Sequence, residues 1–153
     1  MIILGSACLL LFSYKGYEKI DDIVSSIAGV FGLVICLFPC YTNLFDKVGT
    51  FQLTPTLSNT IHSIGAAIFF ILLAFNSLFL FTRHGSEPMS TKKKIRNIIY
   101  VICGIGMVAS FGILALDYFR IQIWLTEAIA LFFFGISWCT KANYYPWLFA
   151  EKD

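Results

Sequence analysis

The sequence predicts an all-α fold, a polytopic bundle of five transmembrane helices with almost no water-soluble part. Three observations predict this fold. Of the 153 residues, 58% are hydrophobic and only 13% are charged, whereas soluble domains carry about 25% charged residues. Several apolar runs approach the roughly 20 residues that a helix needs to cross the hydrocarbon core of a bilayer. The basic residues collect in alternate connections between these runs.

Four of the apolar runs are long enough to span a membrane as helices, in which every backbone polar group is bonded internally. They cover residues 23–41, 60–82, 98–116 and 121–140. A fifth run, 1–14, is short, because a helix of that length reaches roughly 21 Å against a core of roughly 30 Å. We expect residues 1–153 to form a single transmembrane domain.

The first run, 1–14, admits three interpretations. It is a short helix around which the bilayer thins, part of a helix whose upstream residues are missing, or a cleaved signal peptide. The last interpretation is the weakest, because no basic flank precedes the run and no clear small-residue cleavage site follows it. A topology of four spans, with this run outside the membrane, leaves every later segment on the same side.

Basic residues predict the orientation of the chain. With five spans, nine basic residues fall on one side of the membrane and two on the other. Basic connections are retained in the cytoplasm, so we expect the N-terminus outside and the C-terminus inside. The larger group is Lys15, Lys19, Arg83, Lys92, Lys93, Lys94, Arg96, Lys141 and Lys152, and the smaller is Lys47 and Arg120.

Small residues recur at helical spacing in two of the spans. Such spacing lets two helix backbones approach closely, which is how helices associate in lipid. The partner helix would belong to this chain or to a second copy. The alternative is that glycine is simply common in membrane helices. The residues are Ser25, Gly29 and Gly32 in the 23–41 run, and Gly106 and Ser110 in the 98–116 run.

Polar groups of four predicted helices share one level near the outer leaflet. They are Cys36 and Cys40 at the end of one span, His62 early in the next, Asp117 at the following boundary, and Glu127 in the last span. Ionisable residues in spans are costly and are functional candidates. We therefore predict a small outward-facing ligand pocket in which His62 pairs with Glu127. The alternatives are that these groups lie in the interfacial zone, or that a His–Glu pair only fixes helix register.

The same residues do not predict a metal site or a cofactor. Zinc takes three or four His, Cys or carboxylate ligands at typical spacings, and the sequence has neither His-x-x-x-His nor Cys-x-x-Cys. Cys36 and Cys40 could form a redox pair on the outer side, but an i,i+4 pair on a helix is poorly placed for disulfide geometry. Three other polar residues are expected to be structural: Asn76 in an interhelical hydrogen bond, and Asp21 and Asp22 at a helix N-terminus.

Three stretches together resemble small bacterial multi-pass membrane proteins of unknown function, with a looser similarity to the eukaryotic Frag1/DRAM/Sfk1 membrane family. The resemblance implies a five-helix fold in the inner (plasma) membrane of a bacterium, with more residues ahead of the first stretch. It implies no known activity, but it marks His62, Glu127, Asp21 and Asp22 as repeated positions. The stretches are 11–18 followed by Asp21 and Asp22, 62–70, and 124–141.

Three classes of function follow from these features. The first is a non-enzymatic protein that binds a lipid or hydrophobic ligand, or supports a membrane complex, through the predicted pocket. The second is an oligomeric pore, although the spans are too apolar for one chain to line it. The third is an intramembrane lipid-modifying enzyme with His62 and Glu127 as acid and base. Expected partners are membrane lipids and a second copy or another membrane protein. The net charge of +2 does not suggest nucleic acid.

Overall fold

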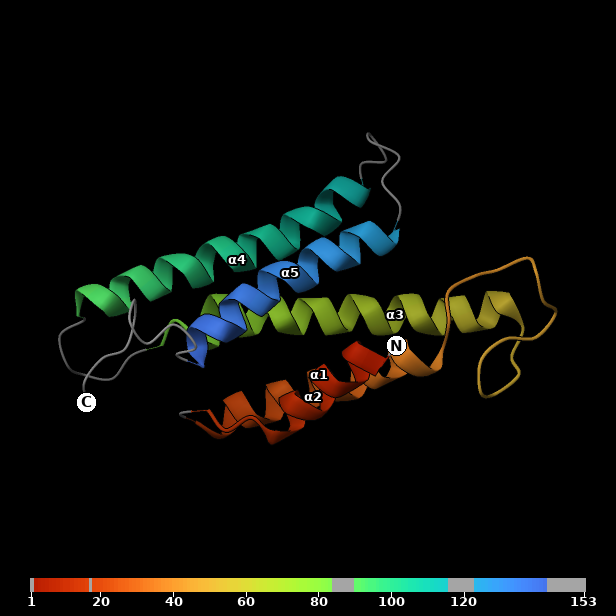
Figure 1. The fold of residues 1–153 in the computed structure, drawn as a ribbon, viewed down its shortest axis with the longest axis horizontal. Helices are drawn as coiled ribbons and strands as arrows, with labels where there is room; N and C mark the ends of the chain where they lie inside the picture. The colour runs from red at the N-terminus through yellow and green to blue at the C-terminus, as the bar shows by residue number, and fades with distance from the viewer. Residues whose placement is uncertain (1, 17, 84–89, 116–122, 143–153) are drawn as a thin grey trace. The chain divides into compact units, whose positions relative to one another are not determined.

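The computed structural model describes residues 2–16, 18–83, 90–115 and 123–142 (Figure 1). Four helices in these residues are long and apolar enough to cross a membrane, and the first helix is short. The predicted all-α fold of five helices is therefore confirmed, and it fits an integral multi-pass membrane protein. The helices are α1 (Ile2–Ser13), α2 (Lys19–Leu37), α3 (Pro55–Phe75), α4 (Thr91–Ala115) and α5 (Ile123–Lys141), and a π-helical turn, η1 (Asn76–Leu80), follows α3.

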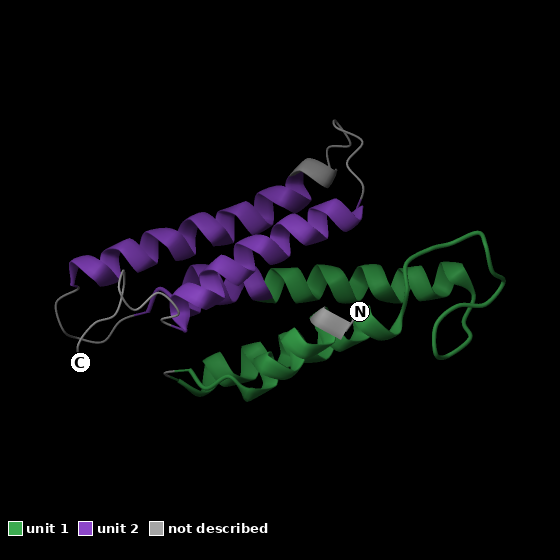
Figure 2. Cartoon of the chain, in the orientation of Figure 1, with its two compact units in different colours: residues 1–72 green, residues 73–153 purple. Residues whose placement is uncertain are grey.

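The chain divides into two compact units, residues 1–72 and 73–153 (Figure 2). The boundary falls within α3. In the first unit α1 packs against α2. In the second unit α4 packs against both α5 and η1.

Helix α2 lies about one turn earlier in the chain than the predicted span 23–41. It begins at Lys19 because the residues before it form a capped turn, described below. It ends at Leu37 because Pro39 disfavours a helical conformation at the preceding residue, and Phe38 is extended, with φ −112° and ψ 103°. Cys40 therefore lies beyond the helix, in the segment 38–54 that joins α2 to α3, here called the 38–54 connection.

The next two helices also begin earlier than the apolar runs indicate. Helix α3 begins at Pro55, a position where proline is favourable because its missing N–H would have no helical partner. The N–H of Phe81 donates to the carbonyl of Asn76, 2.9 Å away, across the π-helical turn. Helix α4 begins at Thr91, where the Ser90 hydroxyl accepts the N–H of Lys93 at 3.2 Å. This contact caps the N-terminus of α4, whose first residues are basic and therefore lie outside the apolar run.

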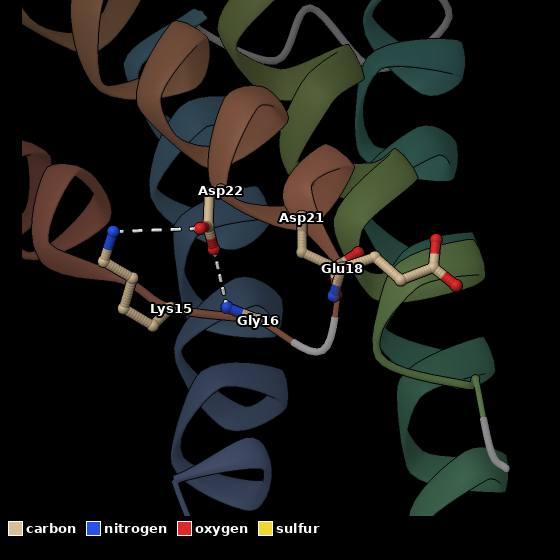
Figure 3. A network of polar contacts seen from close by, with 5 residues as sticks. All are labelled: Lys15, Gly16, Glu18, Asp21 and Asp22. Atoms are coloured by element: carbon tan, nitrogen blue, oxygen red, sulfur yellow. Dashed lines mark hydrogen bonds and ion pairs between the residues drawn. The ribbon is translucent and has the colours of Figure 1, made fainter.

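The turn between α1 and α2 is held by two carboxylates (Figure 3). Asp22 accepts the backbone N–H of Gly16 at 2.8 Å, and its second oxygen lies 3.8 Å from Lys15 Nζ. Asp21 is 1% exposed and accepts the N–H of Glu18 at 3.2 Å. A Cβ at Gly16 would overlap the Asp21 side chain. These contacts satisfy backbone groups at the start of α2, where negative charge also favours the helix dipole.

Small residues lie where helices approach closely within each unit. In the first unit a Cβ at Gly29 would lie 3.0 Å from the Cys8 carbonyl of α1, and one at Gly32 would overlap Cys8 Sγ. Ser25 is also buried on this helix. In the second unit a Cβ at Gly106 would lie 2.8 Å from the Phe133 ring of α5. Ser110 donates instead to the Gly106 carbonyl, at 2.8 Å, within its own helix.

Candidate functional site

The structure brings His62 to Cys40 at the junction of the 38–54 connection with α3. His62 Nδ1 lies 2.7 Å from the carbonyl oxygen of Phe38, and Nε2 lies 3.2 Å from Cys40 Sγ. A carbonyl oxygen only accepts, so Nδ1 must carry the hydrogen. In the neutral imidazole Nε2 is then an acceptor, and the Cys40 thiol donates to it. The imidazole is 3% exposed, whereas Cys40 is exposed.

Helix α3 fixes the chain on both sides of Cys40. Ser58 Oγ donates to the Pro39 carbonyl at 2.8 Å, and Asn59 Oδ1 accepts the N–H of Tyr41 at 3.0 Å. With the contact of His62 to Phe38, three side chains near the start of α3 hold the backbone of residues 38–41. Ser58 and His62 are one helical turn apart and therefore share a face of α3.

The rest of the 38–54 connection is folded back on itself. Val48 and Leu53 exchange two backbone hydrogen bonds of 2.8 and 3.1 Å, and Val48 is buried. Gly49 has φ +71°, and a Cβ there would lie 2.9 Å from Pro39 Cδ, so only glycine fits this turn without strain. The ring of Phe51 stacks on that of Phe38 with centroids 5.2 Å apart. The connection is thus an ordered structure with the Cys40–His62 pair at its base.

Large apolar side chains project from this connection. Tyr41, Leu44, Phe45 and Phe51 are each more than half exposed, and Leu44 reaches 77%. Several large exposed apolar side chains in one short segment make that segment a candidate interaction surface. The connection directly follows α2, one of the helices that are long and apolar enough to cross a membrane.

The other residues of the predicted pocket are more scattered along the fold. Cys36 is half-buried on α2, and Glu127 is half-buried on α5 in the second unit. Asp117 lies outside the described residues. The pairing of His62 with Glu127 stays a prediction. The structure pairs the His62 side chain with that of Cys40, which the sequence places in the same pocket but not in this contact.

Two contributors to the site were absent from the sequence prediction. Ser58 and Asn59 hold the chain beside Cys40, and their only sequence signal is their spacing from His62 at the start of a helix. Within the described residues, no group of three or more His, Cys, Asp or Glu side chains is arranged to hold a metal ion. Asn76 is fully buried in the π-helical turn, where a local departure from α-helix often accompanies function.

The chain was compared with family models, curated proteins and solved structures. No family model, curated protein or solved structure matches the chain. The functional argument therefore depends on the geometry of the Cys40–His62 pair and the surface around it.

Proposed function

We propose that this protein is an integral membrane protein that binds a lipid or another hydrophobic ligand at the 38–54 connection. The observation that carries the proposal is the cluster of exposed apolar side chains, Leu44 and Phe45 foremost, on a connection that also holds Cys40. Ligand sites for amphipathic molecules combine apolar contact area with a few fixed polar groups. Here the apolar side chains would contact acyl chains, and the polar groups at the base would contact the head of the ligand.

The proposal includes an orientation in which the 38–54 connection faces the outside of a bacterial inner membrane. Its support is the distribution of basic residues, nine against two, which favours a cytoplasmic location for the richer side. On that richer side Lys93 Nζ donates to the Phe81 carbonyl at 3.1 Å, and Lys141 Nζ lies 5.5 Å from the Phe81 ring centre. Basic groups at a helix C-terminus also stabilise the helix dipole.

A matched pair of substitutions tests the lipid site. Phe45 in the connection and Phe132 on α5 are 66% and 67% exposed. We expect the protein purified in detergent to retain phospholipid, measured by native mass spectrometry. Phe45→Ser should weaken that retention by about tenfold to a hundredfold, because burial of an aromatic side chain against lipid contributes about 1.5–3 kcal/mol.

Phe132→Ser is the control, because it removes an equally exposed ring from the face of a spanning helix. It should leave the retained phospholipid unchanged. Equal losses in the two variants, or a wild-type protein that retains no phospholipid, would overturn the proposed lipid site.

A further inference from the structure

The Cys40–His62 pair contains the three parts of an activated nucleophile. These parts are a thiol, a base within hydrogen-bonding distance, and a third group that orients the base. The thiol is 3.2 Å from His62 Nε2, and the Phe38 carbonyl orients the ring from 2.7 Å at Nδ1. Because Nδ1 gives its hydrogen to the carbonyl, Nε2 is the nitrogen that can take the thiol proton.

The pair is preorganised. The residues before and after Cys40 are both held by α3, through the contacts of Ser58 with Pro39 and Asn59 with Tyr41. The imidazole is buried, so its orientation is fixed by packing as well as by its two hydrogen bonds. Catalytic groups that are already in position avoid the entropy cost of being ordered during the reaction.

The thiol is also accessible to a reactant. All five cysteines lie in the described part of the chain, none of them forms a disulfide, and Cys40 is the exposed one. Cys8 and Cys103 are buried, while Cys36 and Cys139 are half-buried on helices. The exposed position of Cys40 next to a buried base is typical of a reactive cysteine rather than of a structural one.

We propose that Cys40 is a nucleophile, activated by His62, that accepts a fatty acyl group from a lipid ester or thioester. The choice of an acyl lipid as the reactant rests on the proposed function, because the exposed side chains of Leu44 and Phe45 lie on the same connection and offer an apolar surface for an acyl chain. The pair itself requires only a reactant with an electrophilic carbonyl carbon.

The step is balanced without a further reactant. His62 Nε2 takes the proton of the Cys40 thiol, and the thiolate attacks the acyl carbonyl carbon. The bond from that carbon to the leaving oxygen or sulfur breaks. The imidazolium of His62 returns the proton to the leaving group, which departs as an alcohol or a thiol. The products are S-acyl-Cys40 and the deacylated donor.

The test uses the full chain in detergent micelles with two acyl donors. One is palmitoyl-coenzyme A, a thioester, and the other is a phosphatidylcholine with an alkyne-tagged acyl chain, an ester. We expect a single acyl group on Cys40, located by peptide mass spectrometry and released by hydroxylamine. Labelling by only one donor shows whether the acyl group comes from an ester or from a thioester. Labelling by both donors shows that Cys40 accepts acyl groups from either class of lipid.

Three variants separate the nucleophile from its base. Cys40→Ala should abolish the label, and Cys139→Ala should leave it unchanged. His62→Gln should slow acylation about a hundredfold, the usual contribution of a general base. In folded His62→Gln protein, Cys40 should still react with iodoacetamide at alkaline pH, where a thiol ionises without a base, whereas the buried Cys8 should stay protected.

Acylation of another residue in place of Cys40 would overturn the proposal. Acylation of the His62→Gln variant as fast as the wild type would overturn it as well. A wild-type protein that retains phospholipid but is never acylated would also overturn acyl transfer and leave the lipid-binding function standing. Acylation of Cys40 in a protein that retains no phospholipid would support the nucleophile and overturn the proposed lipid site.

Discussion

The hydroxyl oxygens of Ser77 and Ser137 lie 2.7 Å apart, and both side chains are fully buried. Ser77 Oγ also donates to the Tyr100 carbonyl at 2.9 Å. Because Ser77 has one hydroxyl hydrogen and the carbonyl can only accept, Ser137 must be the donor to Ser77. This chain of two hydrogen bonds links η1, α4 and α5 within the second unit. In lipid such links help to set which helices pair.

The serine pair predicts unequal costs for two substitutions. Ser137→Ala removes one donor and should lower the free energy of unfolding by about 0.6 kcal/mol, a typical interhelical value. Ser77→Ala should cost more, because it removes both hydrogen bonds and leaves the Ser137 hydroxyl buried. Unfolding of the detergent-solubilised protein in increasing dodecyl sulfate would measure both. Strictly additive effects in the double variant would contradict a direct contact.

Close packing in the first unit predicts that Gly32 tolerates no side chain. A methyl group there would meet Cys8 Sγ and lie 3.0 Å from the Phe69 ring, so Gly32→Ala should destabilise the fold by about 1–3 kcal/mol. Gly135 has nothing within 4 Å of an added Cβ, so Gly135→Ala should be neutral or slightly stabilising. The same unfolding assay compares them. If both substitutions gave the same stability, close packing at Gly32 would not be the cause.

The turn before α2 predicts that the hydrogen bond of Asp22, rather than its charge, stabilises the turn. The ion pair with Lys15 spans 3.8 Å and the lysine is 83% exposed, so it should contribute little. Asp22→Asn keeps an oxygen for the Gly16 N–H and should cost only a few tenths of a kcal/mol, the share of its charge in the helix dipole. Asp22→Ala should cost about 1 kcal/mol.

Asp46, exposed in the 38–54 connection, provides the control for that pair of substitutions. Asp46→Ala should leave the free energy of unfolding unchanged in the same assay. A loss for Asp22→Asn as large as that for Asp22→Ala would show that the charge is what stabilises the turn.

The contacts of α3 predict that Asn59 is a positioning residue for Cys40. Asn59→Ala frees the Tyr41 N–H, so the thiol should meet the imidazole less often. The rate of Cys40 alkylation at pH 7 should fall several-fold, while the rate at alkaline pH stays the same. Thr60→Ala is the control, because the Thr60 hydroxyl donates to the Thr56 carbonyl within its own helix. Slower alkylation at both pH values would instead indicate lost access to the thiol.

Hydropathy was sufficient to predict the five helices, because burial in lipid imposes a strong and local requirement on composition. The helix ends were harder, since they depend on polar contacts that hydropathy does not register. Helix α4 begins seven residues before its predicted span because the Ser90 hydroxyl caps a polar first turn. Helix α2 stops at Leu37 because of the proline two residues later.

The contact between Cys40 and His62 was not predicted from the sequence, for a related reason. Sequence position indicated that His62, Cys36 and Cys40 lie at similar depth, but depth does not specify contacts. Cys40 reaches His62 because the chain leaves the helix at Leu37 and runs along the first turns of α3. That path depends on Ser58 and Asn59, whose side chains bond to backbone atoms, and such contacts leave no hydrophobic pattern in a sequence.

Accessibility of Cys40 in intact cells most directly tests the proposal that a reactive thiol lies on the outer face of the membrane. In a variant whose only cysteine is Cys40, a membrane-impermeant maleimide should label the protein before the cells are opened. A Ser90→Cys variant that lacks the five natural cysteines carries its thiol next to the basic start of α4. It should react only after the cells are permeabilised. Labelling of the Ser90 position alone in intact cells would contradict the orientation, and labelling of Cys40 only after denaturation would contradict the exposed thiol.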